Sequence, residues 1–287
     1  MSTQIIQWYP GHIAKAEQQL SKSLEKVDLV VEVRDARIPL ATGHPCLHKW
    51  IRNKKHLLVI NRRDMISQKA FNSWDNWFKE NGQEAWWCNA KDGNGTNKIK
   101  EAAIKLGNDL NNRRESRGMR KRAVRALILG FPNVGKSALI NRLVNKKVVK
   151  SARRAGVTKS LQWVRVGQQL DLLDAPGVLP PQLEDQEAAV KLALCDDIGQ
   201  ASYDVESVAI KFLNILNQVK NESDFETSNQ ILEKRYGISW EESNNNVHLW
   251  LENAANYHTS GNTNRMSQRL LDDFRKRLIG TISLELP

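Results

Sequence analysis

The sequence GFPNVGKS runs from Gly130 to Ser137 and completes the pattern GxxxxGK[ST]. An apolar run at 126–129 precedes it and a helical pattern follows, which is the strand–loop–helix context that this pattern requires. The glycines let backbone N–H groups turn toward phosphate oxygens, while Lys136 reaches the terminal phosphates and the Ser137 hydroxyl can bind Mg²⁺. We therefore predict a phosphate-binding P-loop, formed by Asn133, Val134, Gly135, Lys136, Ser137 and Ala138.

Short runs rich in Val, Ile and Leu alternate with longer helical patterns through the first 175 residues. This alternation is typical of an α/β fold in which helices cover both faces of a parallel sheet. The runs expected to form strands are 29–33, 57–60, 126–129 and 170–173. A helix is expected to open the chain, because one face collects apolar residues at spacings of three and four: Ile13, Ala16, Leu20, Leu24 and Val27.

The composition changes after Pro176, where strand-like runs give way to helical patterns separated by Asn, Ser and Gly. We therefore expect two domains, an α/β domain over residues 1–182 and a smaller all-α domain over 183–287. The segment 265–280 predicts an amphipathic basic helix, which is either an ordinary surface helix or one that binds RNA.

The balance of charge favours a polyanionic partner. The chain has 287 residues, of which 40% are hydrophobic, and a net charge of +11 from 43 basic and 32 acidic residues. A basic surface that serves solubility alone would give the same total. Two clusters of basic residues favour nucleic acid, and the first lacks the apolar face that a membrane-surface helix needs. They are Arg113, Arg114, Arg117, Arg120, Lys121, Arg122 and Arg125, and Lys146, Lys147, Lys150, Arg153 and Arg154.

Several classes of protein are disfavoured. No stretch approaches the roughly 18 apolar residues of a membrane span, and the first residues lack the layout of a secretory signal, so we expect a cytoplasmic protein without a membrane partner. The cysteines Cys46, Cys88 and Cys195 have no metal-ligand spacing and are interpreted as reduced packing residues. We expect any metal to arrive with a nucleotide. No heptad pattern calls for a coiled coil, so a monomer is expected.

A second phosphate-handling element follows the apolar run 170–173. Its sequence is DAPG, from Asp174 to Gly177, and the Asp174 carboxylate would lie near the magnesium ion at the end of the strand. The backbone N–H of Gly177 can reach a terminal phosphate. Between this element and the P-loop lies Thr158, the least specific candidate, which would complete the magnesium shell.

The sequence NRRD, from Asn61 to Asp64, resembles the NKxD motif that reads guanine. The Asp64 carboxylate can accept hydrogen bonds from N1–H and the 2-amino group of guanine, whereas adenine has an acceptor at N1 and no 2-amino group. Arg62 replaces the usual lysine. Its stem and guanidinium can still stack on a purine, so we expect guanine binding to be weakened or retained.

A further element, NAK, comprises Asn89, Ala90 and Lys91 and follows the strand-like run 84–88. It resembles the SAK-type loop of GTPases, in which the backbone N–H of Ala90 would meet O6 of guanine. This short loop is weak alone and gains weight as one of several matches.

The order of these motifs is NRRD, NAK, P-loop, Thr158 and DAPG, which is the order of the circularly permuted GTPases. With the segments WYPGHIAKA at 8–16, DARIP at 35–39 and QWV at 162–164, the chain resembles the bacterial ribosome biogenesis GTPase A family. The match is dense over the GTPase portion and loose beyond it. The resemblance implies a P-loop GTPase fold and Mg²⁺-dependent GTP hydrolysis. It also implies that hydrolysis serves as a checkpoint in late assembly of the large (50S) ribosomal subunit, with the helical domain and basic surfaces contacting rRNA.

The residue that positions the attacking water is not evident from the motifs. Val178 stands where many GTPases have a glutamine, and an apolar side chain cannot hold a water molecule. The resemblance implies that His12 does so, with Lys136 as the second catalytic residue, although His12 could instead pack against or cap the first helix. Slow hydrolysis that the large subunit stimulates would follow. The resemblance also implies a K⁺ ion at Asn133, whose alternative role is to stabilise the loop by hydrogen bonds.

Two other functions remain open from the sequence. One is an ATP-using P-loop enzyme such as a small-molecule kinase, although Asp64 and the loop at Ala90 have no evident purpose in reading adenine. The other is an RNA-binding assembly factor that uses nucleotide only as a structural switch and barely hydrolyses it.

Overall fold

The computed structural model describes residues 6, 20–51, 54–149, 162–175, 177, 185–218 and 226–287. Six strands form one sheet in the order β3-β2-β1-β4-β6-β5. All neighbouring strands are parallel except β5 and β6, which are antiparallel. The strands are β1 Leu29–Asp35, β2 Lys55–Asn61, β3 Ala85–Trp87, β4 Val124–Leu129, β5 Gln162–Val166 and β6 Leu170–Asp174.

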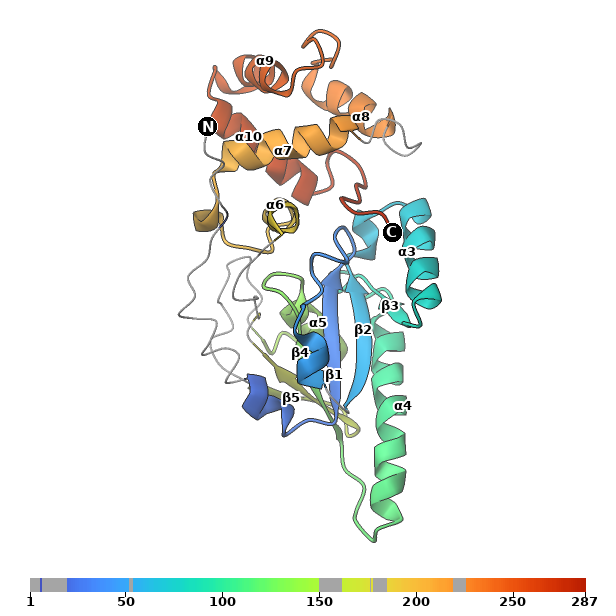
Figure 1. Ribbon diagram of the computed structural model, residues 1–287. Coiled ribbons are helices and arrows are strands. Elements are labelled where there is room, and N and C mark those ends of the chain that lie inside the picture. Colours follow the sequence, from blue (N-terminus) through green and yellow to red (C-terminus); the bar gives the residue numbers. More distant parts are fainter. Residues whose placement is uncertain are drawn as a thin grey trace.

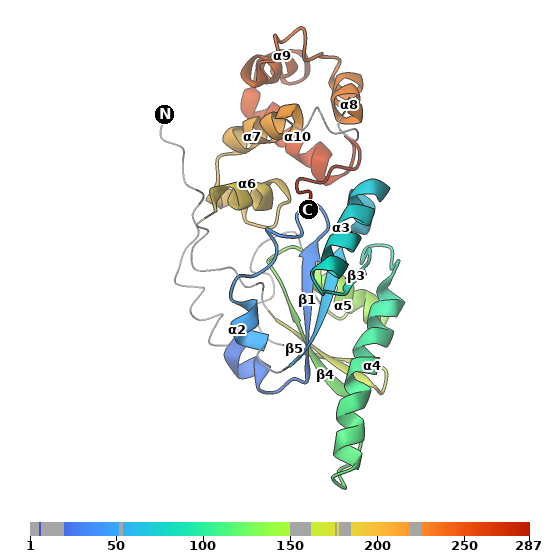
Figure 2. The same cartoon turned by 45° about the vertical axis from the view of Figure 1, so that its right-hand side comes forward.

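Helices flank the sheet and gather beyond one of its ends (Figures 1 and 2). Those of the first part are α2 Leu47–Ile51, the 3₁₀ helix η1 Arg63–Met65, α3 Gln68–Glu80, α4 Thr96–Glu115 and α5 Lys136–Val144. Those of the second part are α6 Gln186–Leu194, the 3₁₀ helix η2 Gln200–Ser202, α7 Val205–Gln218, α8 Glu226–Tyr236, α9 Val247–Thr259 and α10 Thr263–Arg275. In the described residues, no helix combines the length and apolar character needed to cross a membrane.

The two faces of the sheet are covered because alternate strand residues point to opposite sides. Val31 and Val33 of β1 belong to the hydrophobic cluster that includes Ile99 of α4 and Leu139 of α5. Their neighbour Val30 belongs to a different cluster on the opposite face. A third cluster joins α3 to β2 and contains Leu58, Ile60, Ala70, Trp74 and Phe78. The expected α/β sheet with helices on both faces is therefore confirmed.

The sheet differs from the expected one at β5, which was not predicted and runs antiparallel to the rest. Only residues 167–169 separate β5 from β6. A turn this short joins antiparallel strands, whereas parallel strands need a long crossover. The first expected helix is described only from residue 20, and its residues Leu20, Leu24 and Val27 are buried as predicted. Ile13 and Ala16 lie outside the described residues.

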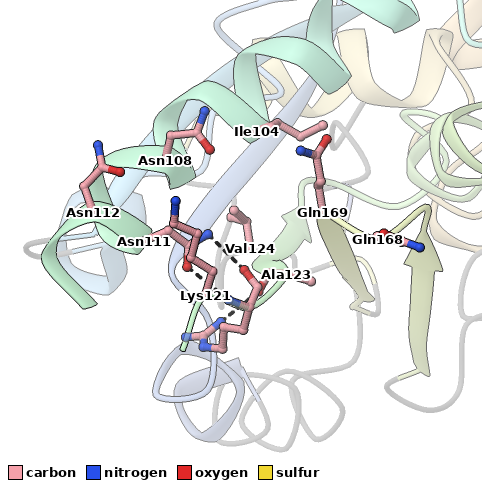
Figure 3. Close-up of a pocket in the computed structure, with 10 residues that line it drawn as sticks. Ile104, Asn108, Asn111, Asn112, Lys121, Ala123, Val124, Gln168 and Gln169 are labelled. Carbon is pink, nitrogen blue, oxygen red and sulfur yellow. Dashed lines mark hydrogen bonds between the residues drawn. The ribbon is translucent and has the colours of Figure 1, made fainter. Parts of the chain in front are cut away.

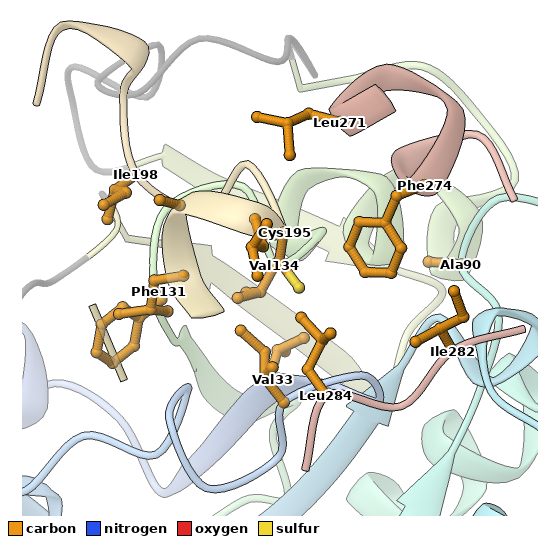
Figure 4. Close-up of a cluster of buried hydrophobic side chains, with 14 of the residues drawn as sticks. Val33, Ala90, Phe131, Val134, Cys195, Ile198, Leu271, Phe274, Ile282 and Leu284 are labelled. Carbon is orange, nitrogen blue, oxygen red and sulfur yellow. The ribbon is translucent and has the colours of Figure 1, made fainter. Parts of the chain in front are cut away.

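The helices α6 to α10 lie across the carboxyl ends of the strands (Figures 1 and 2). Figure 4 shows Phe274 and Leu284 from this region close to Val33 and Val134 from the sheet region, and all four belong to one hydrophobic cluster. The cluster is thus continuous across residue 183, where we expect a domain boundary. That boundary remains a prediction, and the two parts pack closely against each other.

Candidate nucleotide-binding site

The P-loop lies between the end of β4 and the start of α5. Gly135 is the N-cap of α5 and has φ of 102°, and a Cβ at this position would collide with Nδ2 of Asn61. Glycine is therefore required both by the backbone conformation and by the close approach. No side chain caps α5, so the N–H groups of its first turn are directed toward any bound phosphate. Val134 and Ala138 pack in or against the core below the loop.

Lys136 is buried beneath the P-loop. Its Nζ atom donates to the carbonyl oxygens of Gly130 at 3.1 Å and Phe131 at 2.7 Å. Burial lowers the pKa of Lys136 to about 8, against the opposing attraction of Asp174 and Asp197. A phosphate group would provide the anionic partner that favours the charged form of this lysine.

The expected magnesium ligands meet beside the P-loop. Ser137 Oγ lies 3.5 Å from Asp174 Oδ2. The buried Oδ1 atom of Asp174 has no hydrogen-bond partner among the described residues, and burial raises the pKa of this carboxyl group. Such an unpaired oxygen beside a hydroxyl fits the oxygen ligands that Mg²⁺ prefers. Gly177 packs against the P-loop, since a Cβ there would lie 2.6 Å from the backbone nitrogen of Pro132.

The Asn61 side chain joins the elements expected to read guanine to the P-loop. Its Nδ2 atom donates to the Val134 carbonyl at 2.8 Å, and its Oδ1 atom accepts from the backbone N–H of Ala90 at 2.9 Å. Three motifs far apart in the sequence therefore meet at the ends of β2, β3 and β4. The expected contact between the Ala90 N–H and guanine O6 would have to share this donor.

The other residues expected to bind guanine lie near the same ends of β2, β3 and β4. Asp64 lies half-buried in η1, and its backbone carbonyl accepts from Arg277 at 2.8 Å. Asn89 Oδ1 accepts from the backbone N–H of Lys91 at 3.0 Å, and Lys91 itself is exposed. Arg142 of α5 donates to the Lys91 carbonyl and so connects this loop to the P-loop helix.

Arg62 spans the space between the guanine motif and the P-loop. It has φ of 62°, and its Nη2 atom donates to the Asn133 carbonyl at 2.5 Å. Its Nη1 atom donates to Asp35 Oδ2 at 2.6 Å. The guanidinium group is therefore held by the protein, so only the aliphatic stem remains to contact a base.

A buried ion-pair cluster beneath Arg62 was missed by the sequence reasoning. Arg37 pairs with both carboxylate oxygens of Asp35, at 3.0 and 2.7 Å. Burial alone would raise the pKa of Asp35, but Arg37 and Arg62 hold it at about 2. Asp35, Cys195 and Asp197 each place one potential metal-ligand atom within 4.8 Å of the others. Since two guanidinium groups already bind Asp35, we interpret the group as an ion-pair cluster. The sequence shows Asp35 and Arg37 only as part of the segment DARIP at 35–39, after an apolar run, and does not indicate that they form an ion pair.

The end of α6 docks onto this cluster and onto the P-loop. Arg37 Nη2 donates to the Cys195 carbonyl at 3.0 Å, and Asn133 Nδ2 donates to the Asp196 carbonyl at 2.7 Å. From the other side, Arg275 of α10 donates to the carbonyls of Ala193 and Leu194 at 2.8 and 3.0 Å. These donors satisfy carbonyl groups that the helix end leaves unpaired and complement its negative dipole. The Asn133 side chain therefore forms a structural hydrogen bond, as expected for the second of its two possible roles. Binding of K⁺ by Asn133 remains a prediction.

Replacing Arg37 with leucine should lower the free energy of unfolding by about 3–5 kcal/mol, because Asp35 would lose a buried partner. Denaturant unfolding would measure the change. The matched control is Arg165→Leu, since the Arg165 side chain is 80% exposed and pairs with Asp171 at 3.5 Å. The control substitution should lower the free energy of unfolding by less than about 1 kcal/mol. Equal effects of the two substitutions would contradict this account of the cluster.

The free energy of unfolding should fall as the pH rises from about 4 to 8. Burial and the nearby Asp35 raise the pKa of Asp197 to about 8, whereas an unfolded aspartate titrates near pH ~3.9. The folded state therefore binds one more proton across this window, which contributes up to about 1.4 kcal/mol per pH unit. Asp35 acts in the opposite sense, but only below about pH 4. Asp197 interacts electrostatically with five charged groups, namely those of Asp35, Arg62, Arg37, Asp196 and Lys136.

Chemical unfolding of the nucleotide-free protein at pH 5 and pH 8 would measure this dependence. The Asp197→Asn variant cannot titrate there, so its stability should change less between the two pH values than that of the parent. An equal pH dependence in both proteins would contradict the assignment to Asp197.

Two of the expected site residues are not among those that the structure describes. His12 and Thr158 lie outside the described residues, as does Val178. The remaining candidates all lie on or beside the same edge of the sheet.

Comparison with known proteins agrees with this geometry. A family model described as "50S ribosome-binding GTPase" matches residues 125–237. Ribosome biogenesis GTPase A from Bacillus cereus is 40% identical over 75% of this chain and 72% of its own length. The protein of that name from Bacillus pumilus is 36% identical over 82% of this chain and 80% of its own length.

Two solved structures have the same fold. A GDP-bound structure of TM YlqF has a TM-score of 0.62 and 22% identity, and the match covers 94% of this chain and 99% of the other. The GNP-bound YlqF from T. maritima has a TM-score of 0.57 and 24% identity, covering 95% and 98%. Together with the 40% identity to the Bacillus cereus protein, the motif order and the site geometry lead to one assignment. This chain belongs to the ribosome biogenesis GTPase A family and is a circularly permuted GTPase involved in ribosome biogenesis.

Proposed function

We propose that this GTPase acts as a monomer in the cytoplasm during late maturation of the large (50S) ribosomal subunit. In this proposal it binds rRNA and uses GTP hydrolysis as a checkpoint for its release. The observation that carries the proposal is the hydrogen bond from the P-loop residue Asn133 to the Asp196 carbonyl at the end of α6. Through this contact the nucleotide site touches the helical region directly, so a change at the phosphates can alter how that region is held. The names of the relatives support the ribosomal partner.

Within the site, we assign guanine recognition to Asp64, Ala90 and Asn61, with the stem of Arg62 along the base. Asn89 and Lys91 shape the loop beside them. The phosphates are held by the backbone of the P-loop, by Lys136 and by the backbone N–H of Gly177. The contacts of Asn61 with both Val134 and Ala90 support this division of roles.

Ser137, Asp174 and Thr158 would hold Mg²⁺. When bound, this ion neutralises charge that develops on the phosphate oxygens. The buried Oδ1 atom of Asp174, which no described residue bonds, supports its place in this set. Lys136 then exchanges its contacts with the Gly130 and Phe131 carbonyls for contacts with phosphate oxygens.

For hydrolysis, we assign the orientation of the attacking water to His12, since the side chain of Val178 cannot do so. A K⁺ ion at Asn133 would add positive charge beside the phosphates. The amide of Asn133 bonds through Nδ2, which leaves Oδ1 as the atom that would face the ion.

The test is GTP hydrolysis with and without purified large ribosomal subunits, in K⁺ and in Na⁺, for the parent and for His12→Ala. We expect subunits and K⁺ to accelerate the parent, and the variant to bind GTP while losing the acceleration. The control is His248→Ala, which changes an exposed histidine at the start of α9.

Each outcome bears on a different part of the proposal. If His12→Ala matches the parent, then His12 does not orient the water. If subunits leave the rate of the parent unchanged, the ribosomal checkpoint is wrong. Equal rates in K⁺ and Na⁺ would exclude the ion at Asn133.

A further inference from the structure

The first basic cluster lies at the end of the molecule opposite the nucleotide site. Helix α4 is 20 residues long, which corresponds to about 30 Å. It begins beside the loop that contains Ala90, and its C-terminal end projects beyond the other end of the sheet (Figure 1). The chain then returns through residues 116–123 to the start of β4. We call residues 108–123 the α4 tip.

The backbone of the α4 tip is fixed from within. Asn111 accepts from the backbone N–H of Arg122 at 3.2 Å and donates to its carbonyl at 2.9 Å, so the helix holds the returning segment 116–123. The Arg122 guanidinium pairs with both carboxylate oxygens of Asp28, each at 2.7 Å. Arg122 is therefore structural, and the surface it supports is preorganised.

Other arginines of the α4 tip are available to a partner. Arg113, Arg117 and Arg120 are exposed, and no carboxylate in the described part of the chain forms a salt bridge with them. Within the described segments, Lys121 forms a salt bridge only with the exposed Glu115, at 3.1 Å. An exposed pair of this kind contributes little and is easily exchanged for another anion.

Two pockets lie on either side of the returning segment 116–123. One, of about 280 Å³, is lined by Arg113, Arg114 and Arg117 and also by Asp28, whose carboxylate is neutralised by Arg122. The other, of about 340 Å³, is lined by Lys121 and by side-chain amides (Figure 3). The amides available to a partner belong to Asn108, Asn112, Gln168 and Gln169, whereas the amide of Asn111 is already bonded to the Arg122 backbone. Guanidinium groups match phosphates, and amides can both donate to and accept from 2′-hydroxyl groups and base edges.

Most basic residues in and just after helix α10 contact other parts of the protein, although Arg265 is exposed. Arg275 is bonded to the end of α6 and Arg277 to the Asp64 carbonyl. Arg269 packs over the ring of Tyr236. This amphipathic helix therefore serves mainly to hold the helical region in place, which favours the first of the two roles expected for it.

We propose that the α4 tip is an RNA-binding surface that grips the sugar–phosphate backbone of rRNA through Arg113, Arg117 and Arg120, with the neighbouring amides contacting the riboses. This inference rests on the proposed function and adds the place of contact. Because the C-terminal end of α4 lies about 30 Å from its start beside the loop that contains Ala90, the tip anchors the protein on RNA whether GTP or GDP is bound.

The test compares two charge-matched variants of α4 and its extension. Arg113→Glu/Arg117→Glu alters the tip, and Lys98→Glu/Lys105→Glu alters exposed residues nearer the nucleotide site. Binding of each full-length protein to purified large-subunit rRNA and to purified large subunits would be measured over a range of salt concentrations. Arg113→Gln/Arg117→Gln repeats the test without introducing acids. Thermal unfolding and GTP hydrolysis without subunits should be the same in all variants.

We expect the tip variants to bind rRNA at least about 10-fold more weakly than the parent at low salt. The slope of log affinity against log salt concentration should fall by about 1 for each phosphate group that the variant no longer neutralises. Equal reductions of rRNA affinity in tip and control variants, or rRNA binding by the tip variants that matches the parent, would overturn the inference. So would a tip variant that binds rRNA normally but not the subunit, since its partner would be a ribosomal protein. A parent that binds neither would overturn the proposed function as well.

Discussion

Replacing Lys136 with alanine is expected to lower kcat for GTP hydrolysis by about 10²–10³-fold, which is the usual effect of removing one preorganised charge donor. Lys136 is buried below the phosphate loop, and no other lysine of the described chain lies there. A water molecule cannot replace its charge on the terminal phosphates. Single-turnover hydrolysis at saturating GTP would measure the effect separately from binding.

The matched control is Lys146→Ala, which removes an exposed lysine just beyond the same helix. This variant should hydrolyse GTP as the parent does. Thermal unfolding must show that Lys136→Ala remains folded. A folded Lys136→Ala protein with the hydrolysis rate of the parent would show that the lysine does not act on the phosphates.

Replacing Asp64 with asparagine should weaken GDP and GTP binding by about 10²–10⁴-fold. The carboxylate is expected to accept two hydrogen bonds from guanine, and each bond to a charged group contributes about 1.5–3 kcal/mol. Asparagine can accept one of them but brings an N–H group against the other donor. Xanthine has a carbonyl oxygen in place of the 2-amino group, so the variant should bind xanthosine nucleotides better than the parent does.

Equilibrium competition with a fluorescent guanine nucleotide would measure both affinities. Asp109→Asn serves as the control because Asp109 is exposed on α4, away from the site. Undiminished GDP affinity in the Asp64→Asn protein would remove Asp64 from guanine recognition.

Much of the site could be predicted from the sequence because its residues follow apolar strands. Asn61 ends β2 and the P-loop follows β4, and the carboxyl ends of parallel strands meet at one edge of a sheet. Motifs far apart in the chain were therefore expected to be neighbours. The hydrogen bond from Asn61 to Val134, across 73 residues, is the direct result.

Other features depended on contacts that no local pattern reveals. Arg37 bonds to the Cys195 carbonyl, 158 residues away, and nothing near either residue in the sequence indicates the pairing. β5 was missed because it is a short edge strand in which Trp163 and Arg165 are exposed, so it lacks the continuous apolar run of the central strands. The charges of the segment 265–280 left open whether it is an ordinary surface helix or one that binds RNA, because no local pattern reveals that Arg275 bonds to the end of α6.

Competition between nucleotides tests the central claim most directly, namely that three separate segments of the chain form one site specific for guanine. A fluorescent GDP analogue would be bound to the parent protein with Mg²⁺ and then displaced by GTP or by ATP. The account predicts that GTP displaces the analogue at concentrations at least about 10⁴-fold lower than ATP, because adenine would leave Asp64 unpaired. Displacement by ATP and GTP at equal concentrations would contradict it.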